Sequence, residues 1–205
     1  MRKKQGVFFA IVISILTLIS FYFDKEIVKF FEYIRNPLVT DFFMGMTFIS
    51  SEIIIFFFLP SLFLWQEHKR KWILPLWFSL FLSVIVSFFL KILVQRQRPF
   101  QLNIVSLMQE FESLSFSAWN FSFPSFQTMF AFCAVSILSK NFPRFKYIWI
   151  LFAALVGISR VYFGLHFISD VILGGVIGYV IGMIIVKTEK ENKFWERTYG
   201  RVFGK

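Results

Sequence analysis

Long runs of hydrophobic residues, separated by short polar stretches, make up most of the chain. A membrane-spanning helix needs about 20 mostly apolar residues. Six segments approach that length: 6–23, 41–65, 72–91, 125–138, 147–158 and 168–186. The fourth and fifth are short, so we expect their ends to be buried in protein or to lie at the membrane interface. The pattern predicts an all-α fold, a bundle of six transmembrane helices.

Two features refine this prediction. The first run follows a basic start but precedes no small-residue cleavage pattern, so we expect a retained helix rather than a signal peptide. Residues 24–40 then mix charged and apolar positions at helical spacing. They predict an interfacial helix between the first two spans, with an apolar face formed by Phe30, Phe31 and Ile34.

The chain shows no internal repeat and no low-complexity linker. We therefore expect residues 1–205 to form a single domain, with a motif-bearing region at 91–170 and a polar tail at 187–205. In the last run, Gly174, Gly178 and Gly182 recur at steps of four. Small residues at this spacing allow two helices to pack closely.

Composition supports a membrane location and excludes a soluble fold. Hydrophobic residues make up 57% of the chain and charged residues 17%, and a soluble domain of 205 residues cannot bury that much apolar surface. The single cysteine, Cys133, permits no intrachain disulfide.

The net charge of +10 indicates orientation rather than a partner. In a soluble protein it would suggest nucleic-acid binding, but here basic loops flank apolar spans, so we expect none. Of 22 Lys and Arg residues, 15 fall on one set of span ends and 7 on the other. By the positive-inside rule, both termini should be cytoplasmic in a multi-pass plasma-membrane protein.

Three polar clusters fall on the opposite, extracytoplasmic side. In the first, seven residues separate Lys91 from Arg98, which would place both cations on one helix face before Pro99 ends the helix. In the second, Pro124 and Ser125 open a span whose free N–H groups would attract an anion.

The third cluster contains Ser159 and Arg160, followed by His166 and Asp170, whose i, i+4 spacing would let them touch. Charged groups at membrane depth are costly and usually functional. Together the clusters predict a phosphate site with a histidine nucleophile. The alternative is that the cations only anchor helix ends at the lipid headgroups.

These motifs resemble a known family. Lys-x6-Arg-Pro, then Pro-Ser, then Ser-Arg-x5-His-x3-Asp is similar to the type 2 phosphatidic acid phosphatase (PAP2) family. Its members are membrane lipid phosphatases, including undecaprenyl diphosphatases, and are related to vanadium haloperoxidases. The resemblance implies a lipid phosphate or diphosphate substrate and a phosphohistidine intermediate. We expect no metal or other cofactor, because no carboxylate cluster accompanies the motifs and their cations can neutralise the phosphate charge. The resemblance also implies that His166 is the nucleophile, that Asp170 orients it, and that the phosphate is held by Lys91, Arg98, Ser125 and Arg160.

The middle motif departs from the family's Pro-Ser-Gly-His. Phe126 replaces the glycine and would bring a large side chain into the pocket, where it could occlude the phosphate. Gln127 replaces the histidine that protonates the leaving group, and an amide cannot give up a proton. We hypothesise that an enzyme with Gln127 prefers diphosphates, whose leaving group departs as an anion. The alternative is a catalytically impaired member that binds lipid phosphates or a membrane partner.

Three acidic residues remain open at this point. Glu110 and Glu112 lie in the outer loop, where they could replace the missing acid or simply be solvated. Glu52 lies midway along the second run, where a carboxyl group is costly unless it is paired or neutral. The pattern does not choose between a role in the polar pocket and a bond to a neighbouring helix. It also leaves the oligomeric state open.

Overall fold

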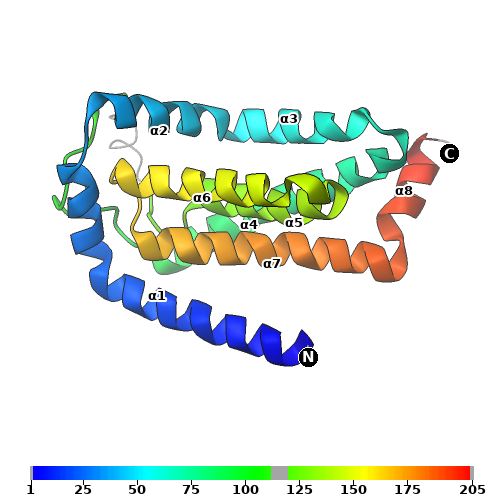
Figure 1. Cartoon of the computed structure of the whole chain (residues 1–205), viewed down its shortest axis with the longest axis horizontal. Helices are drawn as coiled ribbons and strands as arrows, with labels where there is room; N and C mark the ends of the chain where they lie inside the picture. The colour runs from blue at the N-terminus through cyan, green and yellow to red at the C-terminus, as the bar shows by residue number, and fades with distance from the viewer. Residues whose placement is uncertain (1, 112–119, 204–205) are drawn as a thin grey trace.

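The computed structural model describes residues 2–111 and 120–203, and these residues contain helices and no strand. Most helices run along the long axis of an elongated bundle (Figure 1). In chain order the helices are α1 (Arg2–Tyr33), α2 (Pro37–Ile49), α3 (Glu52–Leu64), η1 (Glu67–Trp72), α4 (Ile73–Val94), α5 (Phe126–Asn141), η3 (Pro143–Phe145), α6 (Lys146–Tyr162), α7 (Ile168–Asn192) and α8 (Phe194–Phe203).

Helix α5 lies at the centre of the bundle and packs against α3, α4, α6 and α7. Nine of its 16 residues are buried, which explains how so short an apolar segment is accommodated. Its side chains join the main hydrophobic core, which also includes Phe63, Leu76 and Tyr162 from neighbouring helices. The motifs that predict a phosphate site, at the ends of α4 and α6 and the start of α7, are thereby held around the first turn of α5.

The glycines of α7 allow this close packing, as their spacing predicted. A Cβ on Gly174 would lie 2.8 Å from the carbonyl oxygen of Ser125. One on Gly178 or Gly182 would overlap the backbone of Met129 or Cys133. The backbones of α5 and α7 therefore approach each other over about two helical turns, and the start of α5 is fixed against the start of α7.

The structure supports a membrane protein, but it does not confirm all six predicted spans. In the described part of the chain, three helical segments are long and apolar enough to cross a bilayer: Glu67–Val94, Pro143–Tyr162 and Ile168–Asn192. Helices α2 and α3 would form a fourth, bent by 64° at Ser50 and Ser51. The count of six stays a prediction.

The interfacial helix between the first two spans also stays a prediction. Residues 24–33 continue α1 without a break, because no proline or glycine interrupts the chain between Gly6 and Pro37. The next helix starts at Pro37, where the side chain of Asn36 accepts a hydrogen bond from the backbone N–H of Val39 at 3.1 Å.

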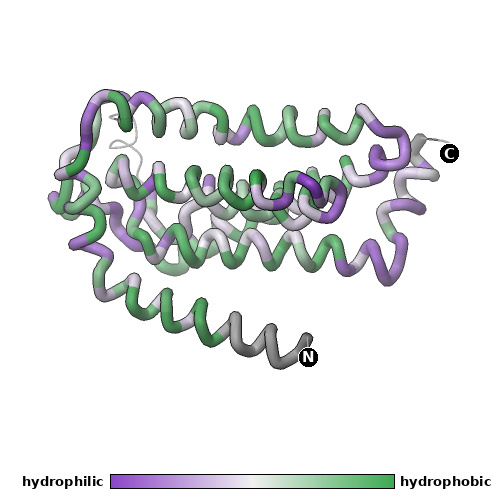
Figure 2. Tube along the Cα trace, viewed as in Figure 1, coloured by the Kyte–Doolittle hydropathy of each residue, from purple (hydrophilic) through white to green (hydrophobic). Residues whose placement is uncertain are grey.

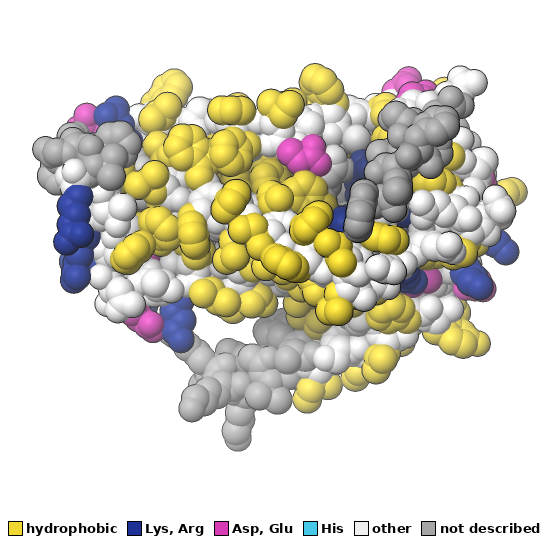
Figure 3. Space-filling view, turned by 180° about the vertical axis from the view of Figure 1, so that it is seen from behind, with side chains coloured by type: hydrophobic (Ala, Val, Ile, Leu, Met, Phe, Trp, Pro, Cys, Tyr) yellow, Lys and Arg dark blue, Asp and Glu magenta, His cyan; other side chains and the backbone are white. Residues whose placement is uncertain are grey.

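Polarity is distributed as a bilayer requires. Hydrophobic residues follow the helices through the middle of the bundle, and hydrophilic ones gather at its two ends (Figure 2). The face seen in Figure 3 is covered by hydrophobic side chains over most of its length, with Lys and Arg mainly towards the ends. Because exposed apolar surface of this extent is stable only in a nonpolar solvent, the surface matches a membrane-embedded protein.

Replacing Gly178 with alanine should destabilise the bundle. The new methyl group would overlap the Met129 carbonyl of α5, and we expect a loss of about 1–3 kcal/mol in unfolding free energy. Gly45→Ala is the matched control, since a Cβ at this position in α2 meets nothing within 4 Å. Thermal unfolding followed by tryptophan fluorescence in detergent should show a lowered midpoint for Gly178→Ala alone.

Candidate active site

One cavity of about 340 Å³ collects most of the predicted site residues at a single end of the bundle. Its polar lining comes from α3, α4, α5, α6 and two loops: Glu52, Ser87, Lys91, Arg98, Gln127, Arg160 and His166. Its apolar lining consists of Val84, Phe88 and Phe126. The cavity therefore combines a cationic end with an apolar side.

Lys91 and Arg98 both line the cavity, but they do not lie on one helix as their spacing predicted. Helix α4 ends at Val94, and Gln95 adopts a left-handed backbone conformation with φ of 50°. Arg98 therefore lies in a loop and not on the same helix face as Lys91. The turn at Gln95 folds the chain back so that both cations line the cavity.

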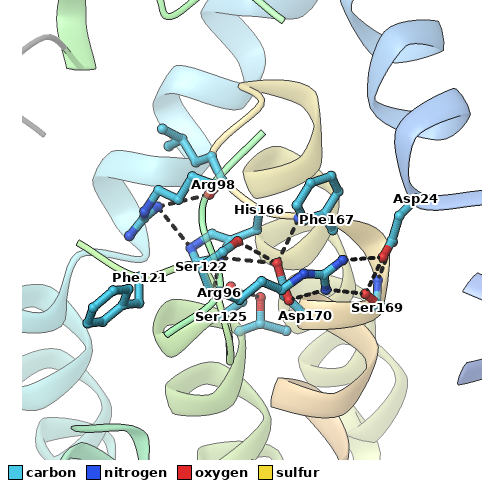
Figure 4. A network of polar contacts seen from close by, with 12 residues as sticks. Asp24, Arg96, Arg98, Phe121, Ser122, Ser125, His166, Phe167, Ser169 and Asp170 are labelled. Atoms are coloured by element: carbon cyan, nitrogen blue, oxygen red, sulfur yellow. Dashed lines mark hydrogen bonds and ion pairs between the residues drawn. The ribbon is translucent and has the colours of Figure 1, made fainter. Parts of the chain in front are cut away.

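His166 is held in a defined orientation. Its Nδ1 lies 2.7 Å from the backbone carbonyl oxygen of Ser122, which can only accept a hydrogen bond, so Nδ1 carries the proton. On the other edge of the ring, Nε2 lies 3.3 Å from Nη1 of Arg98, which can only donate. Figure 4 shows these contacts on the two sides of the ring. They imply that Nε2 is the nitrogen with the free electron pair, which is the tautomer that a nucleophile needs.

Asp170 does not hold the imidazole directly, contrary to our expectation. Its Oδ2 lies 4.0 Å from His166 Nδ1, too far for a hydrogen bond. Instead, Oδ2 accepts the Ser122 hydroxyl and, at 2.9 Å, the backbone N–H of Phe167. The aspartate is thus linked to His166 through Ser122, whose hydroxyl it binds and whose carbonyl binds the imidazole.

Arg98 is anchored to the loops that surround His166. Its Nε donates to the Asn120 carbonyl at 3.2 Å, and Nη1 donates to the Leu165 carbonyl at 2.9 Å. Burial lowers the pKa of the Arg98 guanidinium to about 10, so it stays charged near neutral pH. A fixed guanidinium next to His166 is suited to binding phosphate oxygens.

Two more cations complete the anion site. Lys91 donates to the backbone carbonyl of Phe121. Arg160 is 6% exposed, contacts Thr47 Oγ1 at 3.4 Å, and has a buried Nε that donates to no described group. Among the described residues lining the cavity, Glu52 is the one carboxylate facing these three cations. The site therefore carries a net positive charge that favours an anionic ligand.

The environment of His166 also disfavours its protonation. Burial, followed by the positive charges of Arg98, Lys91 and Arg160, lowers the pKa of the His166 imidazole well below 6.5, although its bond to the Ser122 carbonyl opposes the shift. His166 is therefore neutral at physiological pH. A neutral imidazole can attack phosphorus without first losing a proton.

Ser125 of the middle motif does not line the cavity, although the resemblance implied that it binds phosphate. Ser125 precedes the first residue of α5, but it is fully buried, its hydroxyl pairs with Thr128 Oγ1 at 2.9 Å, and it does not line the cavity. Phe126 and Gln127 do line it. Phe126 packs on Phe130, with ring centroids 5.3 Å apart. The Oε1 of Gln127 is buried and accepts no hydrogen bond from any described residue.

The structure also distinguishes the acidic residues whose roles the sequence did not decide. Glu52 begins α3, next to the bend after α2, and lines the cavity. Glu110 is exposed and does not line it, as expected for a solvated loop charge. Glu112 lies outside the described residues.

Three residues of the network were missed by the sequence reasoning. Ser122 binds both Asp170 and His166, while Arg96 and Asp24 form ion pairs on the far side of Asp170 (Figure 4). Arg96 lies between Lys91 and Arg98, and Asp24 ends the first apolar run, so both positions were visible as charges. Their pairing was not, because it joins segments 72 residues apart.

Comparisons with known proteins find similar phosphatases. Phosphatidylglycerophosphatase B of Bacillus subtilis (strain 168) is 28% identical over 178 residues, which cover 79% of this chain and 81% of the relative. The crystal structure of Aquifex aeolicus LpxE superposes with a TM-score of 0.62 at 31% identity, covering 79% of this chain and 93% of LpxE.

A second solved structure shares the fold at lower identity. It is a transmembrane PAP2-type phosphatidylglycerolphosphate phosphatase from Bacillus subtilis, with a TM-score of 0.69 and 24% identity over 90% of this chain and 97% of the other. The PAP2 superfamily model matches residues 72–194, from the start of α4 to the start of α8, and includes the cavity's three cations and His166. The predicted resemblance is confirmed, and the chain belongs to the PAP2 superfamily of membrane phosphatases.

Proposed function

We propose that the protein hydrolyses a lipid phosphate or diphosphate at this cavity through a phosphohistidine intermediate. The observation that carries the proposal is the setting of His166. Its Nε2 bears the free electron pair and lies 3.3 Å from the Arg98 guanidinium, in a cavity also lined by Lys91 and Arg160. A neutral imidazole among three phosphate-binding cations supports phosphoryl transfer to nitrogen.

The reaction would take place in two displacements. Nε2 of His166 forms a bond to phosphorus, and the bond from phosphorus to the leaving oxygen breaks, with that oxygen keeping the electron pair. Water then attacks the phosphohistidine, releasing phosphate and restoring the neutral imidazole. Lys91, Arg98 and Arg160 would hold the non-bridging oxygens and stabilise their charge in both transition states.

The lining supports an amphiphilic substrate. Val84, Phe88 and Phe126 provide an apolar side to the cavity, next to the cationic end. A phosphate joined to a hydrocarbon tail would satisfy both parts, with the tail reaching the bilayer. In the orientation set by the basic loops, the termini are cytoplasmic and this site faces the outer leaflet of the plasma membrane.

Gln127 directs the proposal towards a diphosphate. A phosphate monoester expels an alkoxide, which is about as basic as hydroxide and departs slowly unless a general acid protonates it. A diphosphate expels a phosphate monoester with a second pKa of about 6, which leaves readily as an anion. Because the Gln127 amide cannot protonate a leaving oxygen, a polyprenyl-type diphosphate is the better substrate.

A catalytically impaired lipid-binding protein is the second candidate. Phe126 and Gln127 line the cavity at positions where the family has glycine and histidine. Both replacements remove residues that the family uses in catalysis. The intact His166 and its bonds to Ser122 and Arg98 favour turnover instead.

Restoring the acid should broaden the substrate range. We expect purified wild-type protein to release phosphate faster from undecaprenyl diphosphate than from phosphatidic acid or phosphatidylglycerophosphate. Gln127→His should raise the monophosphate rates by about 10²–10⁴-fold, because general acid catalysis is worth that much. Gln97→His is the control, since Gln97 is exposed in the loop after α4 and does not line the cavity.

Two results would contradict the proposed preference. One is a wild-type protein that hydrolyses the monophosphates faster than the diphosphate. The other is a Glu52→Gln variant that loses monophosphatase activity while keeping its diphosphatase activity, which would show that the Glu52 carboxyl protonates the leaving group.

Removing the nucleophile should separate turnover from binding. We expect His166→Ala to lower hydrolysis by at least about 10³-fold and to weaken inhibition by vanadate, which mimics the phosphoryl group in transit. His68→Ala is the matched control, because His68 is the chain's other histidine and is exposed in η1. Wild-type protein that binds vanadate and lipid phosphates but releases no phosphate would favour the impaired binding protein.

The neutral His166 should also make stability depend on pH. The folded pKa lies below the unfolded value of about 6.5, so below that pH the unfolded chain binds a proton that the folded protein does not. The melting temperature of the wild type should therefore fall more between about pH 7.5 and pH 5.5 than that of His166→Gln. Equal decreases would show that His166 is not held neutral.

A further inference from the structure

Helix α1, which lies outside the region matched by the family, brings a buried carboxylate to the active site. Asp24 is 2% exposed and lies in the part of α1 that contacts α7. Its Oδ1 accepts the backbone N–H of Ser169 at 3.0 Å, and its Oδ2 accepts the Ser169 hydroxyl. Oδ2 also pairs with Nη2 of Arg96 at 2.7 Å. A carboxylate held by this many donors is fixed in place.

Arg96 joins Asp24 to Asp170. While Nη2 faces Asp24, Nη1 lies 2.7 Å from Asp170 Oδ1 and 2.7 Å from Ser169 Oγ. The guanidinium also lies over the Phe167 ring, 4.2 Å from its centroid. One planar cation is thereby fixed between two carboxylates and against an aromatic face (Figure 4).

The chain of contacts continues to the nucleophile. Asp170 uses Oδ1 for Arg96 and Oδ2 for the Ser122 hydroxyl, and the Ser122 carbonyl accepts the proton of His166 Nδ1 at 2.7 Å. Asp170 itself is 4.0 Å from that nitrogen. The orientation of the imidazole therefore depends on the position of Ser122, which depends on Asp170.

We propose that Asp24 is a positioning residue for catalysis, acting through Arg96 on Asp170 and then through Ser122 on His166. The Arg96 side chain is 22% exposed, so without Asp24 its guanidinium could turn towards water. Asp170, which is fully buried, would then lose its cationic partner. Helix α1 would thus control the alignment of a nucleophile that it does not touch.

The inference rests on the proposed function, and Asp24→Asn tests it. The amide keeps the shape of the side chain but cannot hold the guanidinium by charge. We expect kcat to fall by about 10–100-fold with KM changed less than about threefold, because alignment affects the transition state more than substrate binding. Asp24→Glu should recover part of kcat. Glu26→Gln is the control, since Glu26 is an exposed acid on the same helix.

A double-mutant cycle distinguishes positioning from general stability. If Asp24 acts through Asp170, then Asp24→Asn should lower kcat much less in an Asp170→Asn background than in the wild type. The melting temperatures of the same four proteins should also be non-additive. Additive losses in both quantities, or an Asp24→Asn protein with wild-type kcat, would overturn the proposal.

The two proposals can fail separately. A wild-type protein that hydrolyses none of the lipids would refute the proposed function, and the melting temperatures would still show whether Asp24 and Asp170 are coupled. An active wild type with independent Asp24 and Asp170 would refute only the positioning role.

Discussion

The concentration of positive charge around one cavity is the constraint on which the rest of the structure depends. Lys91, Arg98 and Arg160 line the cavity with a single described carboxylate, Glu52, among its lining residues. Cations of this kind are costly to remove from water unless an anion or fixed dipoles compensate them. Backbone carbonyls from the surrounding loops compensate part of the cost for Lys91 and Arg98. A bound phosphate would compensate the remainder, so the same charge arrangement that burdens the fold favours the ligand.

The helix bundle makes this arrangement possible because it holds the ends of several helices close together. Close packing of α5 on the glycines of α7 sets the first turn of α5 against the first turn of α7. Arg160 near the end of α6, His166 in the next loop and Lys91 near the end of α4 then meet at one end of the molecule. An apolar interior thus supports a site whose cations lie at or near helix ends.

Much of this was predictable from the chain. The apolar runs predicted an all-helical membrane protein, and the spacing of the charged motifs indicated His166 and its three cations, which the structure brings together in one cavity. Predictions based on local geometry were less accurate. Lys91 and Arg98 do not share a helix face, because a left-handed residue at Gln95 ends α4 early. Ser125 turns to Thr128 instead of the cavity.

The sequence by itself indicated the membrane environment, the all-helical fold and the PAP2 family. Hydropathy and motif spacing can be read from short stretches of chain. Only the tertiary structure decided which groups hold the His166 imidazole. Ser122 lies just before α5, Arg96 lies in the loop after α4, and Asp24 lies in α1. They meet only when the bundle is packed. Their hydrogen bonds operate over about 3 Å between atoms far apart in sequence, so no local pattern records them.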